Sequence, residues 1–209
     1  MMRQKQYDKW SLSQPIDQIE NLNLPVLYET EKKLITEVKP SKILDIGCGN
    51  GKRLFSYLES NNIAYVGIEK FIRLFENSPY RESIIEADIL EVDDTNPQLE
   101  DIDCITILGG SLNGIFGFDN HKRAWEKIVK YLPINGKILF DTLLIDGFDT
   151  EQELGEKTIK PNITPPQFFL SQNQLQHIWT GLNIEKIKHK DENISAPYKL
   201  RYYLLIKTK

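Results

Sequence analysis

The stretch from residue 42 to residue 69 constrains the fold more than any other part of the sequence. It begins with a short apolar run, KILDIG (42–47), passes through a glycine-rich turn into a segment with apolar residues at helical spacing (52–61), and ends in a β-prone run, AYVGIE (64–69). A short apolar run of this kind is typical of a strand buried on both faces of a parallel sheet. The stretch therefore predicts a βαβ unit and an α/β protein.

The alternation of strands and helices continues along the chain. We expect further strands at 83–89, 103–110 and 136–144, and helices at 27–38, 71–78 and 121–132. Residues 145–170 lose this periodicity and contain three prolines, which predicts an irregular insertion. Ser171 is expected to cap a further helix. The β-prone runs at 182–189 and 198–208, with 191–197 as the joint, are expected to form an antiparallel pair at the sheet edge.

Composition narrows the partners and the location. The 209 residues include 26 Lys and Arg against 30 Asp and Glu, a net charge of -4, so no overall basic field exists to attract nucleic acid, and no nucleic-acid partner is expected. No apolar run approaches the ~20 residues that span a bilayer, and the polar start lacks the apolar core of a secretory signal. We therefore expect a cytoplasmic protein with no membrane partner.

No metal site is predicted from the cysteines, the histidines or the acids. Cys48 and Cys104 lie far apart without the spacing of metal ligands, and we interpret both as small packing residues. The three histidines lack metal-binding spacing as well. Asp141 and Asp146, near the fifth strand, are too few for a metal-dependent methylation site.

The turn after the first strand carries the clearest ligand signal. Gly47, Gly49 and Gly51 alternate there, two residues after Asp45. Glycines let the backbone approach a ligand closely, and we expect the N-terminus of the next helix to supply free N–H donors. The spacing is GxGxG, whereas the dinucleotide fingerprint is GxGxxG. A carboxylate beside the turn would repel a pyrophosphate but suits S-adenosylmethionine, which carries a sulfonium and an ammonium group and no phosphate. Glu69, ending the second strand, is placed to accept hydrogen bonds from ribose hydroxyls.

With these residues, from about residue 27 onward, the chain resembles the class I S-adenosylmethionine-dependent methyltransferases. Its strongest match is the DxGxGxG motif of residues 45–51, supported by residues 87–89 after the third strand and 108–113 after the fourth. The resemblance implies that Asp45 and the glycines contact the methionine part, Glu69 the ribose, and Asp88 with Ile89 the adenine edge. The implied cofactor site comprises Asp45, Gly47, Cys48, Gly49, Asn50, Gly51, Glu69, Lys70, Ala87, Asp88, Ile89, Leu108, Gly109, Gly110 and Ser111, of which 108–111 form the floor between cofactor and substrate.

The resemblance also implies the fold and the reaction. We expect a Rossmann-like, doubly wound, mostly parallel seven-stranded sheet with an antiparallel last strand and helices on both faces. One domain, 1–209, would comprise an N-terminal arm or lid (1–26), a cofactor-binding core (27–144), the insertion (145–170) and a C-terminal helix with the edge strand pair (171–209). The reaction would be in-line methyl transfer to a nitrogen or oxygen of a small molecule, catalysed mainly by proximity and orientation in a monomer or homodimer.

No catalytic residue is fixed by the sequence, and His121 and Tyr7 are weak candidates. His121 also fits a surface residue at the start of a helix. Tyr7 and Trp10, with Phe168, Phe169 and Trp179, fit either an aromatic lid over the substrate or ordinary packing.

Alternative interpretations remain for several of these residues and for the function of the chain. Glu69 also fits an exposed acid paired to Lys70, Asp88 a turn residue, and Gly109 with Gly110 a simple strand end. For the whole chain, the alternatives are a catalytically silent methyltransferase-like binding subunit and a nicotinamide-dependent oxidoreductase.

Overall fold

The computed structural model describes residues 29–115, 117–145, 168, 170–195 and 198–209. Its helices and strands alternate in chain order as α3 (Glu29–Val38), β1 (Lys42–Ile46), α4 (Lys52–Ser60), β2 (Ala64–Glu69), β3 (Ile84–Glu86), β4 (Cys104–Ile107), α5 (Phe118–Lys130), β5 (Lys137–Ile145), α6 (Gln172–Gly181), β6 (Ile184–Ser195) and β7 (Tyr198–Lys207). Short 3-10 turns lie at Ile72–Leu74, Arg81–Ser83, Pro97–Leu99 and Ser111–Gly114. Most of the expected elements are therefore confirmed.

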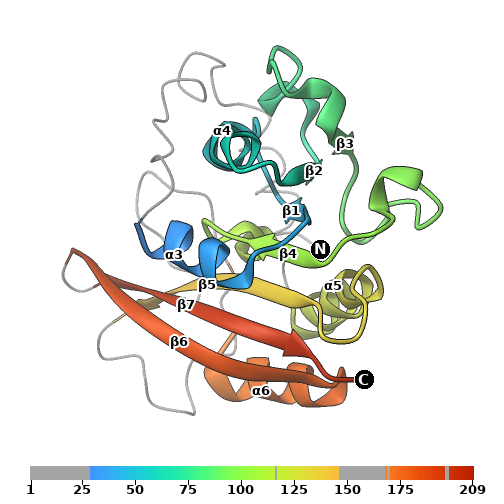
Figure 1. Cartoon of the computed structure of the whole chain (residues 1–209). Helices are drawn as coiled ribbons and strands as arrows, with labels where there is room; N and C mark the ends of the chain where they lie inside the picture. The colour runs from blue at the N-terminus through green and yellow to red at the C-terminus, as the bar shows by residue number, and fades with distance from the viewer. Residues whose placement is uncertain (1–28, 116, 146–167, 169, 196–197) are drawn as a thin grey trace.

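The strands form one seven-stranded sheet in the order β3-β2-β1-β4-β5-β7-β6 (Figure 1). Strands β1 to β5 pair in parallel, and β7 lies antiparallel between β5 and β6. The predicted mostly parallel sheet with an antiparallel last strand is confirmed. Because β1 pairs with both β2 and β4, the strand order reverses at β1. Ligands of open α/β sheets bind at such a switch point, outside the carboxyl ends of the strands.

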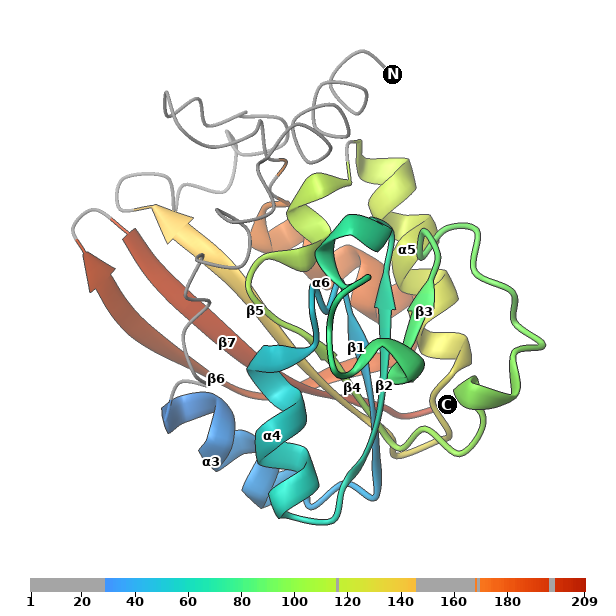
Figure 2. The ribbon, with the colours of Figure 1, turned by 90° about the horizontal axis from the view of Figure 1, so that it is seen from above.

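Helices cover both faces of the sheet, as expected (Figure 2). Helices α3 and α4 pack on one face, and α5 and α6 pack on the other. Strand β5 serves both cores, because Ile138 and Phe140 point to the α5 side while Leu139 points to the α3 side. Ser171 caps α6 in a capping box with Gln174, which confirms the predicted helix start.

Some expected elements differ from the structure, among them the strand predicted at 103–110, which is Cys104–Ile107. Residues 71–78 form only a 3-10 turn at Ile72–Leu74, since Pro79 follows within a few residues and no helix can extend through it. Strand β3 ends at Glu86, because Asp88 folds the chain into a turn in which its Oδ1 accepts from the Leu90 N–H at 2.9 Å. The joint predicted at 191–197 is largely strand, because β6 continues to Ser195 opposite β7 through two bulges.

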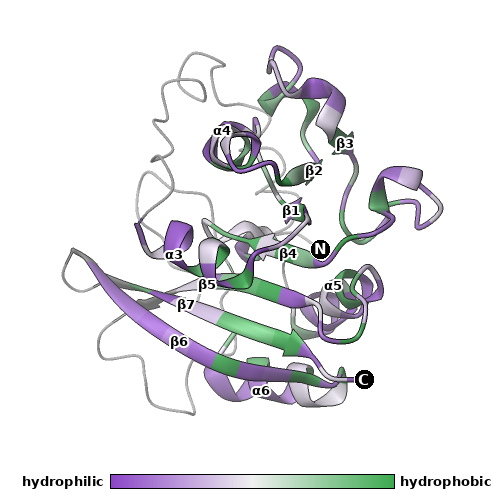
Figure 3. Cartoon of the chain, viewed as in Figure 1, coloured by the Kyte–Doolittle hydropathy of each residue, from purple (hydrophilic) through white to green (hydrophobic). Residues whose placement is uncertain are grey.

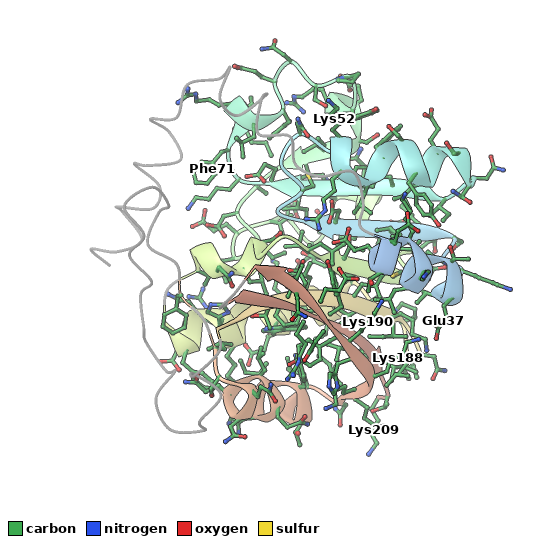
Figure 4. All side chains as sticks on the ribbon, turned by 90° about the vertical axis from the view of Figure 1, so that its left-hand side faces the viewer. Glu37, Lys52, Phe71, Lys188, Lys190 and Lys209 are labelled. Carbon is green, nitrogen blue, oxygen red and sulfur yellow. The ribbon has the colours of Figure 1, made fainter. Side chains whose placement is uncertain are left out.

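The edge of the sheet at β6 is polar. In Figure 3 this strand is mostly hydrophilic, whereas β7 beside it carries most of the hydrophobic residues of the pair. Lys188 of β6 pairs with Glu37 of α3, and Figure 4 shows the two side by side. Lysine on an edge strand discourages pairing with another chain, so this edge fits the end of the sheet. Within the part of the chain that the structure describes, no helix is both long and apolar enough to cross a bilayer.

Candidate functional site

The glycine turn after β1 requires its glycines. Gly47, Gly49 and Gly51 have φ values of 68°, 57° and 74°, in the left-handed region that other residues seldom adopt. Gly47 also has no room for a side chain, because an added Cβ would lie 2.7 Å from the Cβ of Ser111. The turn after β1 and the turn after β4 therefore touch at the switch point of the sheet.

The backbone N–H donors of the glycine turn are used within the protein. They are donated by Gly47 and Cys48 to the Ile68 oxygen (2.8 and 3.2 Å), by Gly49 to Glu69 Oε2 (3.0 Å), by Gly51 to the Cys48 oxygen (3.0 Å) and by Lys52 to Asn50 Oδ1 (3.0 Å). The expectation of free donors at the helix N-terminus is therefore wrong for Lys52, the first residue of α4. These five N–H groups are thus not available to the phosphates of a ligand.

Glu69 lies under the glycine turn rather than on the surface. Its side chain is buried, and its carboxylate accepts from the N–H of Gly49 at 3.0 Å and of Phe71 at 3.1 Å. Burial raises the pKa of Glu69, and the hydrogen bonds oppose that shift. The exposed, Lys70-paired alternative is wrong, since Lys70 pairs with Asp88 at 3.2 Å. The carboxylate has four lone-pair sites, so beside the backbone N–H groups of Gly49, Phe71 and Lys70 it keeps acceptor capacity for a ligand.

Asp45 is a second buried carboxylate at the end of β1. Its oxygens accept hydrogen bonds from Thr106 Oγ1 at 2.7 Å and from the Tyr65 hydroxyl at 3.4 Å. Burial raises the pKa of Asp45 to about 7, although Thr106 and the Arg53 guanidinium oppose the shift. Asp45 therefore changes its charge close to neutral pH.

Residues 87–89 lie beside Glu69, as expected of one site. The Ala87 N–H donates to the backbone oxygen of Glu69 at 3.0 Å, and Ile89 is buried. Asp88 also occupies the turn position proposed as its alternative, so its role in the fold is settled by geometry. Cys48 packs its sulfur against Gly67, where an added Cβ would lie 2.4 Å away, and burial raises the pKa of its thiol. Cys48 is thus a packing residue.

A second glycine turn, Leu108–Ser111, follows β4 and is called here the floor turn. Gly109 and Gly110 have φ values of 72° and 71°, and their N–H groups donate to the two carboxylate oxygens of Asp141 at 2.7 and 2.9 Å. Asp141, on β5, is fully buried, and burial raises its pKa. The two glycines therefore do more than end a strand.

Two members of this arrangement were missed from the sequence. Asp141 was considered only as a metal ligand, although an acid inside the apolar run KILFDTLL is itself a signal of a buried role. Arg53 of α4 also reaches the floor turn, since a Cβ added to Gly109 would lie 2.5 Å from Arg53 Nη1. Its guanidinium forms an ion pair with Glu31 of α3. No group of three or more acids, histidines or cysteines suited to a metal occurs among the described residues.

His121 is buried, so the expectation of a surface helix-start residue is wrong. Helix α5 begins at Phe118, three residues earlier than predicted, which turns His121 inward with Ala124 and Trp125. Its ring lies 5.2 Å from that of Phe168, and neither ring nitrogen has a hydrogen-bond partner among the described residues. Burial lowers the pKa of His121 to about 4, which keeps the imidazole neutral at ordinary pH.

Only two residues of the expected aromatic lid, Phe168 and Trp179, lie within the described part of the chain. Trp179 belongs to the core, with its ring 5.9 Å from Trp125 and 5.2 Å from Tyr203, so packing is the correct alternative for this residue. Tyr7, Trp10 and Phe169 lie outside the described residues.

Known proteins resemble this chain in part of the sequence and in the whole fold. No family model matches. A tRNA U34 carboxymethyltransferase of Campylobacter hominis is 26% identical over 121 residues, which is 56% of this chain and 41% of that protein. The chain thus spans about two fifths of the length of this curated relative.

Solved structures match over nearly the full length at low identity. An S-adenosylmethionine-dependent methyltransferase from Clostridium acetobutylicum has a TM-score of 0.67 at 13% identity and covers 97% of this chain, which in turn covers 99% of it. The N-methyltransferase NodS of Bradyrhizobium japonicum, in complex with S-adenosylhomocysteine, has a TM-score of 0.63 at 16% identity, with 99% and 100% covered. The [4+2]-cyclase SpnF has a TM-score of 0.67 at 12% identity, with 99% and 96% covered. The chain therefore has the class I methyltransferase fold.

Proposed function

We propose that the chain binds S-adenosylmethionine at the glycine turn and transfers its methyl group to a small-molecule acceptor. One observation carries the proposal. The backbone N–H groups of residues 47, 48, 49, 51 and 52 all donate within the protein, while two carboxylates, Asp45 and Glu69, lie beneath the same turn. Such a site suits a ligand with cationic groups and hydroxyl donors and disfavours the pyrophosphate of a nicotinamide cofactor.

The residue roles follow from the chemistry of this ligand. Glu69 accepts hydrogen bonds from the ribose hydroxyls through its remaining lone pairs. Asp45 supplies negative charge below the methionine part. The glycines, Cys48 and Asn50 of the turn contact the same part of the ligand. Residues 87–89 and Lys70 surround the adenine end, and the floor turn separates the methionine part from the acceptor.

The transfer itself needs little from the protein beyond alignment. The bound cofactor supplies an electrophilic methyl group on a sulfonium sulfur. An acceptor nitrogen or oxygen held in line with the carbon–sulfur bond would form the new bond to carbon, the sulfur would leave with the bonding pair as a neutral thioether, and the acceptor would lose its proton to water or to a nearby base. Proximity and orientation therefore account for most of the rate, and no residue of this chain is required as nucleophile.

The class of acceptor is supported by charge and by the residues after β4. The net charge of -4 gives no general attraction to nucleic acid, and GGSL stands where amino-methylating DNA enzymes of this class usually carry [DNS]PP[YFW]. We also propose a cytoplasmic location, as expected from the composition of the chain. A tRNA acceptor is the second candidate, and the match to a tRNA U34 carboxymethyltransferase favours it.

Calorimetric titration with S-adenosylhomocysteine tests the cofactor site, with NADH as a parallel ligand and Asp45→Ala as the variant. We expect micromolar binding of S-adenosylhomocysteine, at least about tenfold weaker in Asp45→Ala, and no binding of NADH. Tight NADH binding, or binding of neither ligand, would reject the proposal.

Transfer of label from radioactive S-adenosylmethionine tests the acceptor. Unfractionated tRNA and a panel of small amines, phenols and acids are the probes. Label in a small molecule supports the first candidate, label in tRNA supports the second, and transfer to neither favours a silent binding subunit. The fold alone does not require methyl transfer, since the [4+2]-cyclase SpnF shares it.

A further inference from the structure

The floor turn is held by a carboxylate that a ligand cannot reach. Two successive residues in the left-handed region, Gly109 and Gly110, aim their N–H groups at one point. Converging backbone N–H groups of this kind form a concave site for an anion. Asp141 fills that site from β5 with both carboxylate oxygens, at 2.7 and 2.9 Å, and has no exposed surface. The anion of this site is therefore part of the protein.

Arg53 holds the same turn from α4. Its guanidinium lies against Gly109, at the place where any side chain on that residue would be. Burial alone would lower the pKa of Arg53, but Glu31 first, and then Asp141 and Asp45, raise it above its usual value. Arg53 is thus a cation that pairs with Glu31 of α3, lies against Gly109 of the floor turn and is affected by the charges of Asp141 and Asp45.

Burying these charges is costly, which points to a purpose other than stability. The effective penalty for a buried ion is several kcal/mol, and well-packed apolar residues often stabilise a fold better than a buried ion pair does. What the charges do provide is a fixed shape. They select, for Gly109 and Gly110, one of the many backbone conformations open to glycine, and Ser111 then packs against Gly47 of the glycine turn.

We propose that Asp141 and Arg53 are positioning residues, which set the affinity for the cofactor by holding the floor turn in its binding shape without touching the ligand. The inference rests on the proposed function, because it needs the cofactor to bind between the glycine turn and the floor turn. It assigns a role to Asp141 that the resemblance did not supply.

Asp103 offers a matched control at the opposite end of the sheet. Its carboxylate also accepts backbone N–H groups, from Ser41 at 2.8 Å and from Lys42 at 3.2 Å, where β1 begins. The experiment is calorimetric titration of the wild type, Asp141→Asn and Asp103→Asn with S-adenosylhomocysteine, with thermal unfolding of each. Asparagine can accept only at its oxygen, so one glycine N–H loses its partner in Asp141→Asn.

We expect the Kd to rise about tenfold or more in Asp141→Asn and to stay within about twofold in Asp103→Asn, although both variants lose stability. A folded Asp141→Asn protein whose Kd stays within about twofold of the wild type would overturn the inference while leaving the proposed function intact. A wild type that does not bind S-adenosylhomocysteine would instead reject the proposed function, and this inference with it.

Arg53→Lys keeps the inference testable if Asp141→Asn does not fold. Lysine retains the charge but not the planar fork that lies against Gly109. We expect the Kd of S-adenosylhomocysteine to rise about threefold or more, and the amide hydrogens of Gly109 and Gly110 to exchange faster than in the wild type. An unchanged Kd together with unchanged exchange in folded Arg53→Lys would contradict the proposal.

Discussion

The two glycine turns at the carboxyl edge of the sheet are built alike but used differently. Each places glycines in the left-handed region, and each gives a glycine N–H to a buried carboxylate from the neighbouring strand, Glu69 for the turn after β1 and Asp141 for the floor turn. Both oxygens of Asp141 accept from two successive glycine N–H groups, and its side chain is 0% exposed. Glu69 is 6% exposed and accepts from only one glycine. The Glu69 carboxylate thus keeps a small exposed surface, and the Asp141 carboxylate keeps none.

The two turns suggest a general point: a buried carboxylate that accepts glycine N–H groups can bind a ligand or can hold a backbone turn in place. What separates the two acids is how much acceptor capacity the fold leaves to each. If the account is right, changes at the turn after β1 alter ligand contacts directly, and changes at the floor turn act through conformation.

The largest effect is expected where the two turns meet. Gly47→Ala places a Cβ 2.7 Å from the Ser111 Cβ, on a residue whose φ is 68°. The clash and the strained backbone together cost about 2–4 kcal/mol, so we expect S-adenosylhomocysteine binding to weaken about a hundredfold or more in calorimetry. Gly181→Ala is the control, since nothing lies within 4 Å of its added Cβ. Equal affinity in the two variants would show that the turns are not coupled.

A smaller effect is expected at Glu69. Glu69→Gln removes the charge and leaves the N–H groups of Gly49 and Phe71 to compete for one amide oxygen. Losing charge-assisted hydrogen bonds to backbone and ribose is expected to weaken S-adenosylhomocysteine about tenfold. Glu86→Gln, at the matching exposed end of β3, should leave the Kd unchanged. If both variants bind like the wild type, Glu69 does not contact the ligand.

The pH dependence of binding separates Asp45 from the other acids. Because burial raises its pKa to about 7, Asp45 is protonated below that pH, and the ammonium group of the ligand favours its charged form. We expect the Kd of S-adenosylhomocysteine to rise about tenfold from pH 8 to pH 6, and this slope to vanish in Asp45→Asn. A pH profile that is flat in the wild type, or equally steep in the variant, would exclude this role.

The raised pKa of Asp45 affects the stability of the unliganded protein in the opposite direction: the contribution to stability falls as the pH rises, whereas ligand affinity increases. The pKa of Asp45 is higher in the folded protein than its ordinary value of 3.8, so folding favours the protonated form. Its contribution to stability is fully present below about pH 3.8 and is lost as the pH rises through about 7. Urea unfolding of the wild type and Asp45→Asn at a series of pH values measures this contribution.

The smallest effect is expected at His121, which lies on α5 and belongs to neither turn. His121→Phe keeps a ring against Phe168 and removes two buried nitrogens that lack partners among the described residues. We expect the free energy of unfolding to increase by about 1 kcal/mol in urea, with the Kd of S-adenosylhomocysteine unchanged. A loss of stability would instead indicate that the imidazole has a partner that holds the fold together.

The sequence predicts the sheet well because its signals are local. Apolar runs mark the strands, and the glycines at 47, 49 and 51 mark the first turn, so the strands and the position of Glu69 follow from the chain order. The seven-stranded topology was predicted from the resemblance to the class I methyltransferases. Asp141 is different, because its partners lie 31 and 32 residues away and depend on how β4 and β5 pair. The burial of His121 also depends on tertiary structure, since it follows from a helix that begins three residues early. Glu69 was thus predicted from its place after the second strand. Asp141 was missed, and its only signal was an acid in an apolar run.

A crystal structure of the complex with S-adenosylhomocysteine would test the distinction between the two acids most directly. We predict that the Glu69 carboxylate lies within hydrogen-bonding distance of the ribose hydroxyls, and that Asp141 still accepts from Gly109 and Gly110 without touching the ligand. A nucleoside bound away from Glu69, or a ligand group in direct contact with Asp141, would contradict the account.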